Sequence, residues 1–258
     1  ISVWIEKLFK ISILWFKHDT YHRCLHDSNS TQYLYSIQNS TSMLLSSLIT
    51  KVFGVKRNRS DTSRRNRMSS LLFFQSYPSL YLFILQQLES SQISESHSQL
   101  LFINPILIIL SKLIISKSAN NIYDATKFLP LIENIIYNCR DARLRHLAVC
   151  TYNRLLPSTS YSNIIVNFNN QFIENETKMK KSNYLHGLAM LLAEISREFY
   201  LHTMNSSPES QDLSVLLIEL YQKLIIMFKN KSITNDLILG ILHQAHYRIY
   251  LCLKLKNL

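Results

Sequence analysis

Residues 34–53 read LYSIQNSTSMLLSSLITKVF, and this stretch decides the fold class. Its apolar side chains recur at steps of three, four and seven residues: Ile37, Leu44, Leu45, Leu48, Ile49 and Val52. Side chains at those steps share one face of an α-helix. The stretch therefore predicts an amphipathic helix over 34–53.

The same helical spacing recurs along the rest of the chain, interrupted by polar connections rich in Ser and Asn. We expect further helices over 78–89, 99–117, 130–138, 141–156, 183–201, 212–229 and 233–256. Asp141 suits an N-cap, Pro130 suits a first helical position, and Pro157 closes the helix that precedes it.

A run of amphipathic helices with short polar joints is typical of an α-solenoid of armadillo, HEAT or TPR-like helical repeats. The predicted fold class is all-α, with antiparallel helix pairs and no sheet. No repeat period can be read from the sequence, so a compact helical bundle remains the alternative. The expected organisation is an N-terminal helix and loop over 1–33, then one helical-repeat region over 34–258.

Composition also favours helices. Hydrophobic residues make up 47% of the 258 residues and charged residues 17%, which excludes a largely disordered chain. Three glycines and five prolines are too few for a fold rich in hairpins or βα units. Residue 1 is Ile rather than Met, so we expect the chain to be a fragment of a longer protein.

Two apolar stretches, 1–16 and 100–115, invite a membrane interpretation. Charged residues interrupt both, for example Lys10 and Lys112, and both fall short of the roughly 18–20 residues that a span needs. Buried helices are expected instead, with no membrane span.

The sequence carries no recognisable catalytic pattern. Three glycines allow no phosphate-binding glycine loop, and the metalloprotease and hydrolase motifs are absent. One stretch, HDTYHRCLHD (18–27), places His18, His22 and His26 four residues apart and resembles a zinc site. Solvated polar residues explain this stretch better, so no metal site is predicted. The four cysteines are far apart and are expected to be free thiols.

The strongest functional signal is a basic segment, residues 51–67, which contributes +6 to a net charge of +11. Its paired arginines alternate with Ser and Asn, a pattern suited to phosphate oxygens. The predicted RNA-contacting residues are Lys56, Arg57, Arg59, Arg64, Arg65 and Arg67. A solvated linker is the alternative interpretation.

Four aromatic residues follow the basic segment: Phe73, Phe74, Tyr77 and Tyr81. An exposed ring among them could stack on an RNA base. We expect Phe73 and Phe74 to belong to the core instead.

Several blocks resemble the THADA family (thyroid adenoma-associated protein) in the order in which that family carries them. These blocks are NSTSMLLSSLITKVFGVKR (39–57), SRRNRMSSLLFFQSYPSLYLFILQQLE (63–89), LFINPILIILSKLI (101–114), RDARLRHLAVCTYNRLLPS (140–158) and NYLHGLAMLLAEI (183–195). The residues that match family motifs are Asn39, Ser40, Phe53, Gly54, Asn66, Met68, Asn183, His186 and Gly187. The chain departs from the family pattern at Gln38, where the family has Arg, and at 69–72.

The resemblance implies a large cytoplasmic helical-repeat protein without catalytic residues. Such a protein would bind a tRNA 2′-O-methyltransferase subunit and position tRNA for ribose methylation at nucleotide 32 of the anticodon loop. The partner would bind S-adenosylmethionine, so no cofactor is expected here, nor any contact with DNA. The alternative is a protein-interaction scaffold, linked to calcium-pump regulation and energy storage, that does not contact RNA.

Two residues of the last block carry structural expectations. Gly187 costs helix propensity, so we expect it to permit a close helix crossing. His186 has no acid or nucleophile near it in the sequence, so a hydrogen-bonded structural role is expected rather than catalysis.

Overall fold

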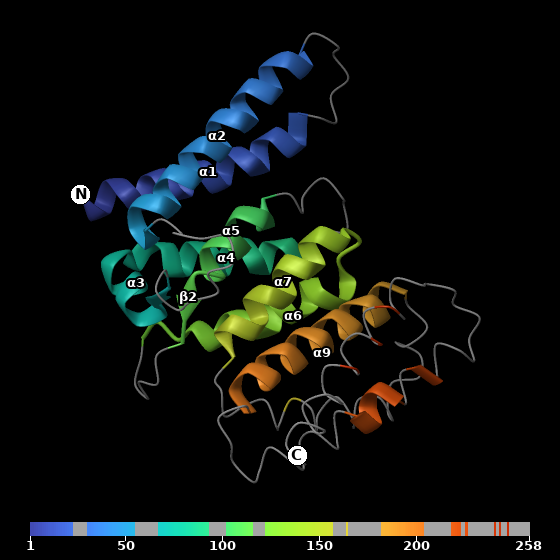
Figure 1. Cartoon of the computed structure of the whole chain (residues 1–258). Coiled ribbons are helices and arrows are strands. Elements are labelled where there is room, and N and C mark those ends of the chain that lie inside the picture. Colours follow the sequence, from blue (N-terminus) through green and yellow to red (C-terminus); the bar gives the residue numbers. More distant parts are fainter. Residues whose placement is uncertain are drawn as a thin grey trace. The chain divides into compact units, whose positions relative to one another are not determined.

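The structure is a computed structural model (Figure 1). It describes residues 1–22, 30–54, 67–92, 102–115, 122–156, 164, 182–203, 218–222, 225–226, 240, 243 and 247. The chain divides into two compact units, Ile1–Asn134 and Ile135–Leu258.

The first unit contains most of the described helices. In order they are α1 (Ser2–His22), α2 (Ser30–Phe53), β1 (Met68–Ser69), α3 (Ser70–Ser76), α4 (Pro78–Gln92), α5 (Ile103–Leu110), β2 (Leu113–Ile114) and the 3₁₀ turn η3 (Ala125–Phe128). The first two helices form an antiparallel pair (Figure 1).

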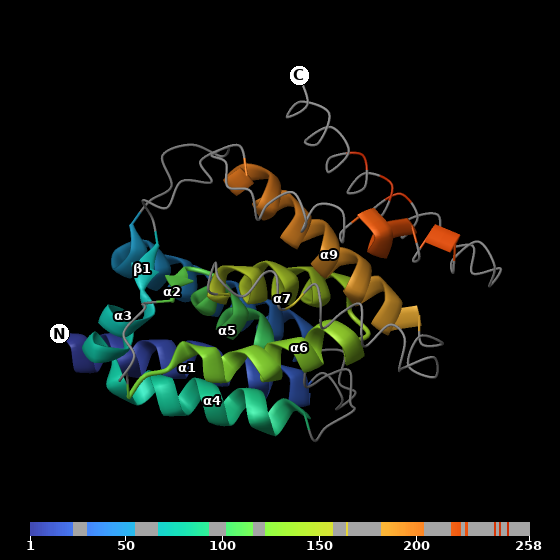
Figure 2. The same cartoon turned by 90° about the horizontal axis from the view of Figure 1, so that it is seen from below.

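The second unit contains α7 (Ala142–Leu155) and α9 (Ser182–Thr203), which pack side by side (Figures 1 and 2). The boundary between the units lies within α6 (Leu129–Asn138). Tyr221, in the short helical stretch 218–222, is buried, and its hydroxyl lies 2.8 Å from the Ser196 hydroxyl of α9.

The predicted all-α, helical-repeat class is confirmed. The helices expected over 34–53, 78–89, 130–138, 141–156 and 183–201 correspond to α2, α4, α6, α7 and α9. Asp141 is the N-cap of α7, where its Oδ1 accepts hydrogen bonds from the backbone N–H of Arg143 and of Leu144. Most of 212–229 and 233–256 lies outside the described residues, as does Pro157.

The helix expected over 99–117 is shorter than predicted, and the expectation of no sheet is wrong. α5 ends at Leu110, where the N–H of Lys112 turns back to the carbonyl of Ile109 at 3.0 Å. Leu113 and Ile114 then extend and pair in parallel with Met68 and Ser69. An apolar run reads the same as a buried helix or a buried strand, which explains the error.

A cluster of aromatic rings forms the core of the first unit. Phe73 and Phe74 of α3 are fully buried, with ring centroids 5.1 Å apart. Phe73 stacks on Phe53 at the end of α2 at 5.4 Å, and Phe74 meets Tyr81 of α4 edge-on at 5.1 Å. The short helix α3 therefore ties α2 to α4 through its two phenylalanines.

A buried carboxylate joins α1 to the start of α4. Glu6 Oε1 accepts a hydrogen bond from the backbone N–H of Ser79 at 2.9 Å. Ser79 follows Pro78, the first residue of α4, so the carboxylate satisfies an N–H that has no partner within its own helix. The negative charge also favours the helix N-terminus.

None of the helices among the described residues combines the length and the apolar character that crossing a bilayer requires.

We predict that Phe73→Ala destabilises the first unit by about 3–5 kcal/mol, because it removes a fully buried ring with four aromatic neighbours. Urea unfolding followed by circular dichroism measures the loss. The neighbouring Leu72 is 58% exposed, so Leu72→Ala is the matched control and should change stability by less than about 0.5 kcal/mol. Equal effects at the two positions would contradict the assignment of the core.

Candidate functional site

The predicted RNA-contacting segment is described only at its two ends. Lys56, Arg57, Arg59, Arg64, Arg65 and the motif residue Asn66 lie outside the described residues. Lys51 is exposed near the end of α2, and Arg67 is half-buried immediately before β1. The structure therefore fixes where the segment leaves and re-enters the first unit.

The segment leaves α2 through the motif residues Phe53 and Gly54. Phe53 is buried against Phe73, which anchors the last turn of the helix. Gly54 has a φ of 84°, and its N–H bonds to the carbonyl of Thr50 at 2.9 Å. A left-handed residue at this place ends a helix, and glycine adopts that conformation without steric cost. These two motif residues direct the chain out of the helix.

The segment re-enters through Arg67 and Met68, beside a cation that sequence reasoning did not assign to the site. The N–H of Met68 donates to the carbonyl of Lys112 at 3.1 Å, and Met68 is in register with Leu113. Because the pairing is parallel, Arg67 and Lys112 lie next to each other. Sequence analysis treated Lys112 only as an interruption of an apolar stretch. A pairing of two residues per strand, between segments 44 positions apart, leaves no recognisable pattern in the sequence.

The aromatic residues that follow the basic segment face the core. Phe73, Phe74 and Tyr81 are buried, and the Tyr81 hydroxyl donates to the carbonyl of Asp124 at 3.0 Å. Tyr77 is half-buried, with its ring edge-on to Phe73 at 5.2 Å. The expectation that Phe73 and Phe74 are core residues is confirmed. The idea of base stacking by Tyr81 is wrong, because its ring is enclosed by Phe74 and Phe128.

The motif residues Asn39 and Ser40 lie on the exposed side of α2. The Ser40 hydroxyl donates to the carbonyl of Ser36 at 2.8 Å, a bond within the helix. This bond gives Ser40 a local structural role.

The other motif residues, Asn183, His186 and Gly187, lie at the start of α9, where this helix meets α7 and the end of α6. Arg145 of α7 connects these elements. Its Nη1 donates to Asn183 Oδ1 and to the carbonyl of Arg140, both at 3.1 Å, and to the carbonyl of Cys139. Its Nε donates to His186 Nδ1 at 3.3 Å. We call these residues the Arg145 junction: Cys139, Arg140, Arg145, Asn183 and His186.

Arg145 is buried, and it donates to carbonyl oxygens, an amide oxygen and an imidazole nitrogen. Burial lowers the pKa of its guanidinium from the ordinary value of an arginine. Cys139 and Arg140 follow the last residue of α6, so the cation meets carbonyls at a helix C-terminus, where positive charge is favoured. Sequence analysis missed Arg145, although its position four residues after the N-cap Asp141 places it on the inner face of α7.

His186 is buried and hydrogen-bonded within the Arg145 junction. Since its Nδ1 accepts from Arg145, the neutral ring carries its proton on Nε2. Burial lowers the pKa of the His186 imidazole, and the charges of Arg145 and His146 lower it further. Within the described part of the chain, no group of His, Cys, Asp or Glu is arranged to hold a metal ion. The side chains of His18, His22, Cys24 and His26 are outside that part.

Gly187 permits the expected close crossing. A Cβ built on this residue would lie 2.1 Å from the carbonyl oxygen of Ile136 in α6, closer than real Cβ contacts allow. Tyr137 and Tyr184 stack beside it with centroids 4.5 Å apart. The apolar face expected for this helix is buried at Leu185, Leu188, Leu192 and Ile195, while the side chain of Phe199 is not among those described.

We predict that Gly187→Ala destabilises the protein by at least about 1–3 kcal/mol, because a methyl group there collides with a backbone carbonyl. Gly187→Leu should cost more. Gly240→Ala is the matched control, since a Cβ at that helical position meets nothing within 4 Å. The control should stabilise by up to about 1 kcal/mol through helix propensity. Stabilisation by Gly187→Ala in chemical unfolding would refute the close crossing.

We predict that His186 makes stability depend on pH. Its pKa is lowered in the folded state, so the unfolded chain binds the proton more readily and stability rises with pH. The contribution is complete above the ordinary pKa of 6.5 and is lost as pH falls through the folded-state pKa. Protonation would place an N–H on Nδ1, facing the Arg145 donor.

His186→Gln tests this account, because a glutamine oxygen can still accept from Arg145 but does not titrate. Unfolding free energies at pH 7.5 should therefore be similar for the variant and the wild type. At pH 5 the wild type should have lost more stability than the variant. The same loss in both proteins would show that other groups cause the pH dependence.

The amino-acid sequence of the chain is similar to those of known proteins. The family model described as "Trm732, C-terminal TPR repeats" matches residues 38–195. Curated relatives named "tRNA (32-2'-O)-methyltransferase regulator THADA" are similar to parts of the chain. The Gallus gallus protein is 39% identical over 111 residues, which cover 41% of this chain and 6% of the relative.

Two further relatives with the same name extend the comparison. The Mus musculus protein is 48% identical over 60 residues, 23% of this chain and 3% of its own length. The Drosophila melanogaster protein is 34% identical over 128 residues, 43% of this chain and 7% of its own length. The matched part is thus a small fraction of each relative. No solved structure matches the chain.

The family model covers more than half of the chain and includes both the basic segment and the Arg145 junction. Parts of the chain are similar to the THADA relatives, and the chain belongs to the family of the Trm732 C-terminal TPR repeats.

Proposed function

We propose that this chain acts in a non-catalytic scaffold that regulates a tRNA ribose 2′-O-methyltransferase. In this role it would hold tRNA so that nucleotide 32 of the anticodon loop reaches the active site of the partner enzyme. The observation that carries the proposal is the similarity to relatives whose name is tRNA (32-2'-O)-methyltransferase regulator. The helical-repeat fold supports it, because stacked helices form extended binding surfaces.

The basic segment is the proposed tRNA contact. Its arginines would bind phosphate oxygens through two parallel hydrogen bonds, and these contacts position an RNA without reading its sequence. Lys51, Arg67 and Lys112 support this role from the described surface, since they place positive charge at both ends of the segment. Because Phe73, Phe74 and Tyr81 belong to the core, phosphate contact rather than base stacking would carry the affinity.

The chemistry belongs to the proposed partner. The methyltransferase would bind S-adenosylmethionine and transfer the methyl group, while this chain supplies no catalytic side chain. The buried His186 and Arg145 hold helices together in this account, so their replacement affects folding before it affects methylation. The proposed location is the cytoplasm, where such an enzyme meets mature tRNA.

We predict that Ser at Arg57, Arg59, Arg64, Arg65 and Arg67 weakens tRNA binding and flattens its salt dependence. Each phosphate contact that is lost should reduce the slope of log K against log salt by about 0.7–0.9. The measurement is fluorescence anisotropy with a tRNA across a series of salt concentrations. The matched control carries Lys at the same five positions and should keep most of the slope, because it keeps the charges.

Unchanged affinity and slope in the Ser variant would make the segment a solvated linker. The alternative function, a protein-interaction scaffold without RNA contact, would then replace the proposal.

A further inference from the structure

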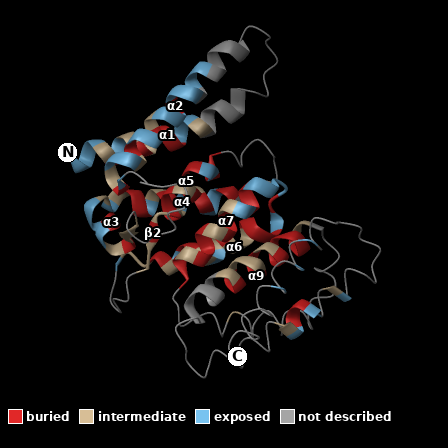
Figure 3. Ribbon diagram, viewed as in Figure 1, coloured by how far each residue is buried: buried red, intermediate tan, exposed pale blue. Residues whose placement is uncertain are grey.

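Helix α1 carries apolar side chains on two opposite faces. Phe9 and Ile13 are fully buried and pack into the first unit. On the other side, Trp4 is 68% exposed, and Ile11 and Trp15 are each 44% exposed. Buried and exposed positions accordingly alternate along α1 (Figure 3). Trp4, Ile11 and Trp15 are separated by seven and four residues, so they form one stripe along the helix. A helix that is apolar on both faces is typically covered on both.

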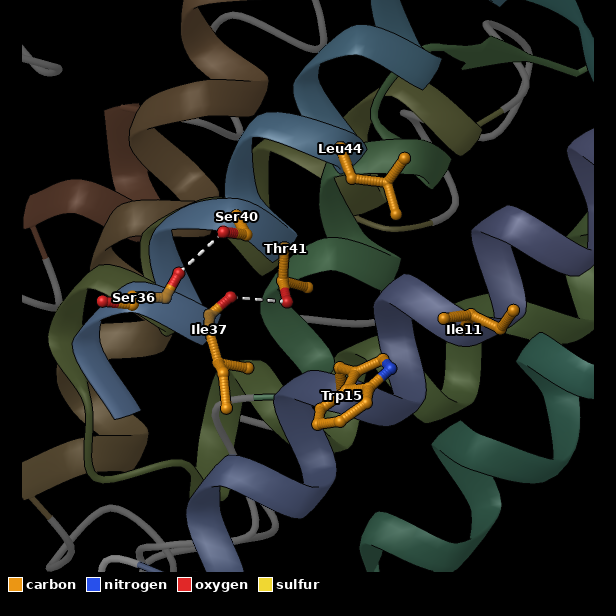
Figure 4. Close-up of a pocket in the computed structure, with 7 residues that line it drawn as sticks. All are labelled: Ile11, Trp15, Ser36, Ile37, Ser40, Thr41 and Leu44. Carbon is orange, nitrogen blue, oxygen red and sulfur yellow. Dashed lines mark hydrogen bonds between the residues drawn. The ribbon is translucent and has the colours of Figure 1, made fainter. Parts of the chain in front are cut away.

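The exposed stripe borders a groove between α1 and α2. Ile11 and Trp15 form one side of this groove of about 350 Å³, and Ser36, Ile37, Ser40 and Thr41 of α2 form the other (Figure 4). The small side chains of α2 leave room for a third helix to approach closely.

The hydroxyl groups in this groove do not make it polar. Ser40 donates to the carbonyl of Ser36 and Thr41 to that of Ile37, each at 2.8 Å and within α2 (Figure 4). Since these donors are directed to their own helix, the groove offers mainly methyl, methylene and indole surface. Such a surface suits the apolar face of an amphipathic helix.

Among the described side chains, a basic group lies beside the groove. Lys7 lies one turn before Ile11 on the same face of α1 and is exposed, with its Nζ 4.9 Å from the Trp4 ring. The neighbouring Glu6 is buried and bonded to Ser79, so it does not neutralise this surface.

We propose that the groove between α1 and α2 docks an amphipathic α-helix of a partner protein, with its apolar stripe on Ile11, Trp15 and Ile37 and acidic residues beside Lys7. The acidic residues of this helix would complement the positive charge of Lys7. A second copy of the chain would instead bring its own Lys7 to a surface that already carries Lys7. The proposal is independent of the tRNA contact, because it concerns a different surface and a different class of ligand.

The test uses the full 258-residue chain and two synthetic helical peptides of about 18 residues, or five turns. Both carry Leu at heptad spacing, with Glu on the flanks of one and Lys on the flanks of the other. The Glu-flanked peptide should bind about threefold tighter, the scale of an exposed ion pair. Lys7→Glu should reverse this preference. Equal binding of both peptides, or no binding of either, overturns the proposal.

Two variants of α2 locate the site. Ile37→Asp should weaken binding of the Glu-flanked peptide about tenfold, because it places a carboxylate in the apolar contact. Met43→Asp is the matched control, since Met43 is 72% exposed on the same helix but does not line the groove. It should bind like the wild type. Circular dichroism must show the same helix content in all variants, and an equal loss in both α2 variants overturns the assignment.

Two further measurements distinguish the partner helix from other occupants of the groove. They are sedimentation of the free chain and peptide binding by a longer family member. A dimer of the free chain that Ile37→Asp dissociates would assign the groove to a second copy and contradict the proposal. Peptide binding that disappears when the chain is embedded in a longer family member would assign the groove to an adjacent repeat, which also contradicts it. A monomer that binds the Glu-flanked peptide in both contexts supports the partner helix.

Discussion

The Arg145 guanidinium is the interaction on which the helix junction of the second unit depends. A charge removed from water must be satisfied by hydrogen bonds, and Arg145 obtains them from four acceptors at two helix ends. The carbonyls of Cys139 and Arg140 come from the end of α6, the Asn183 amide and the His186 ring from the start of α9. The cation can be buried only when both ends are in place. This requirement specifies which helix termini meet, and Gly187 then allows the backbones to approach.

The first unit differs from the second, because its positive charge is concentrated in one segment of the sequence. Seven basic residues lie within 51–67, and the structure secures both ends of that segment with apolar anchors. Phe53 and Gly54 end α2 at one side, while β1 pairs with β2 at the other. Phe73 and Phe74 follow directly and fill the core. The sequence thus places residues that fix the fold on either side of a strongly basic segment, which is consistent with the proposed role in tRNA positioning.

Local patterns in the sequence predict much of this structure. The spacing of 34–53 identifies α2, Asp141 marks the start of α7, and the glycine of NYLHG marks the close crossing at Ile136. Contacts between distant segments are not predictable in this way. The pairing of Met68 with Leu113 involves two residues per strand, too few for an alternating pattern. In the sequence alone, Arg145 does not differ from the other arginines of RDARLRHL. Its role is visible only through its acceptors from α6 and α9.

The same limit applies to the candidate site. The cluster of cations in 51–67 is visible in the sequence, whereas Lys112 joins it only through the fold. The most direct test of the central claim is ultraviolet crosslinking of tRNA to the chain, with the crosslinked peptides identified by mass spectrometry. The account predicts crosslinks within 51–67 and beside Lys112 that high salt suppresses. Crosslinks confined to other parts of the chain, or equally strong at high salt, would contradict it.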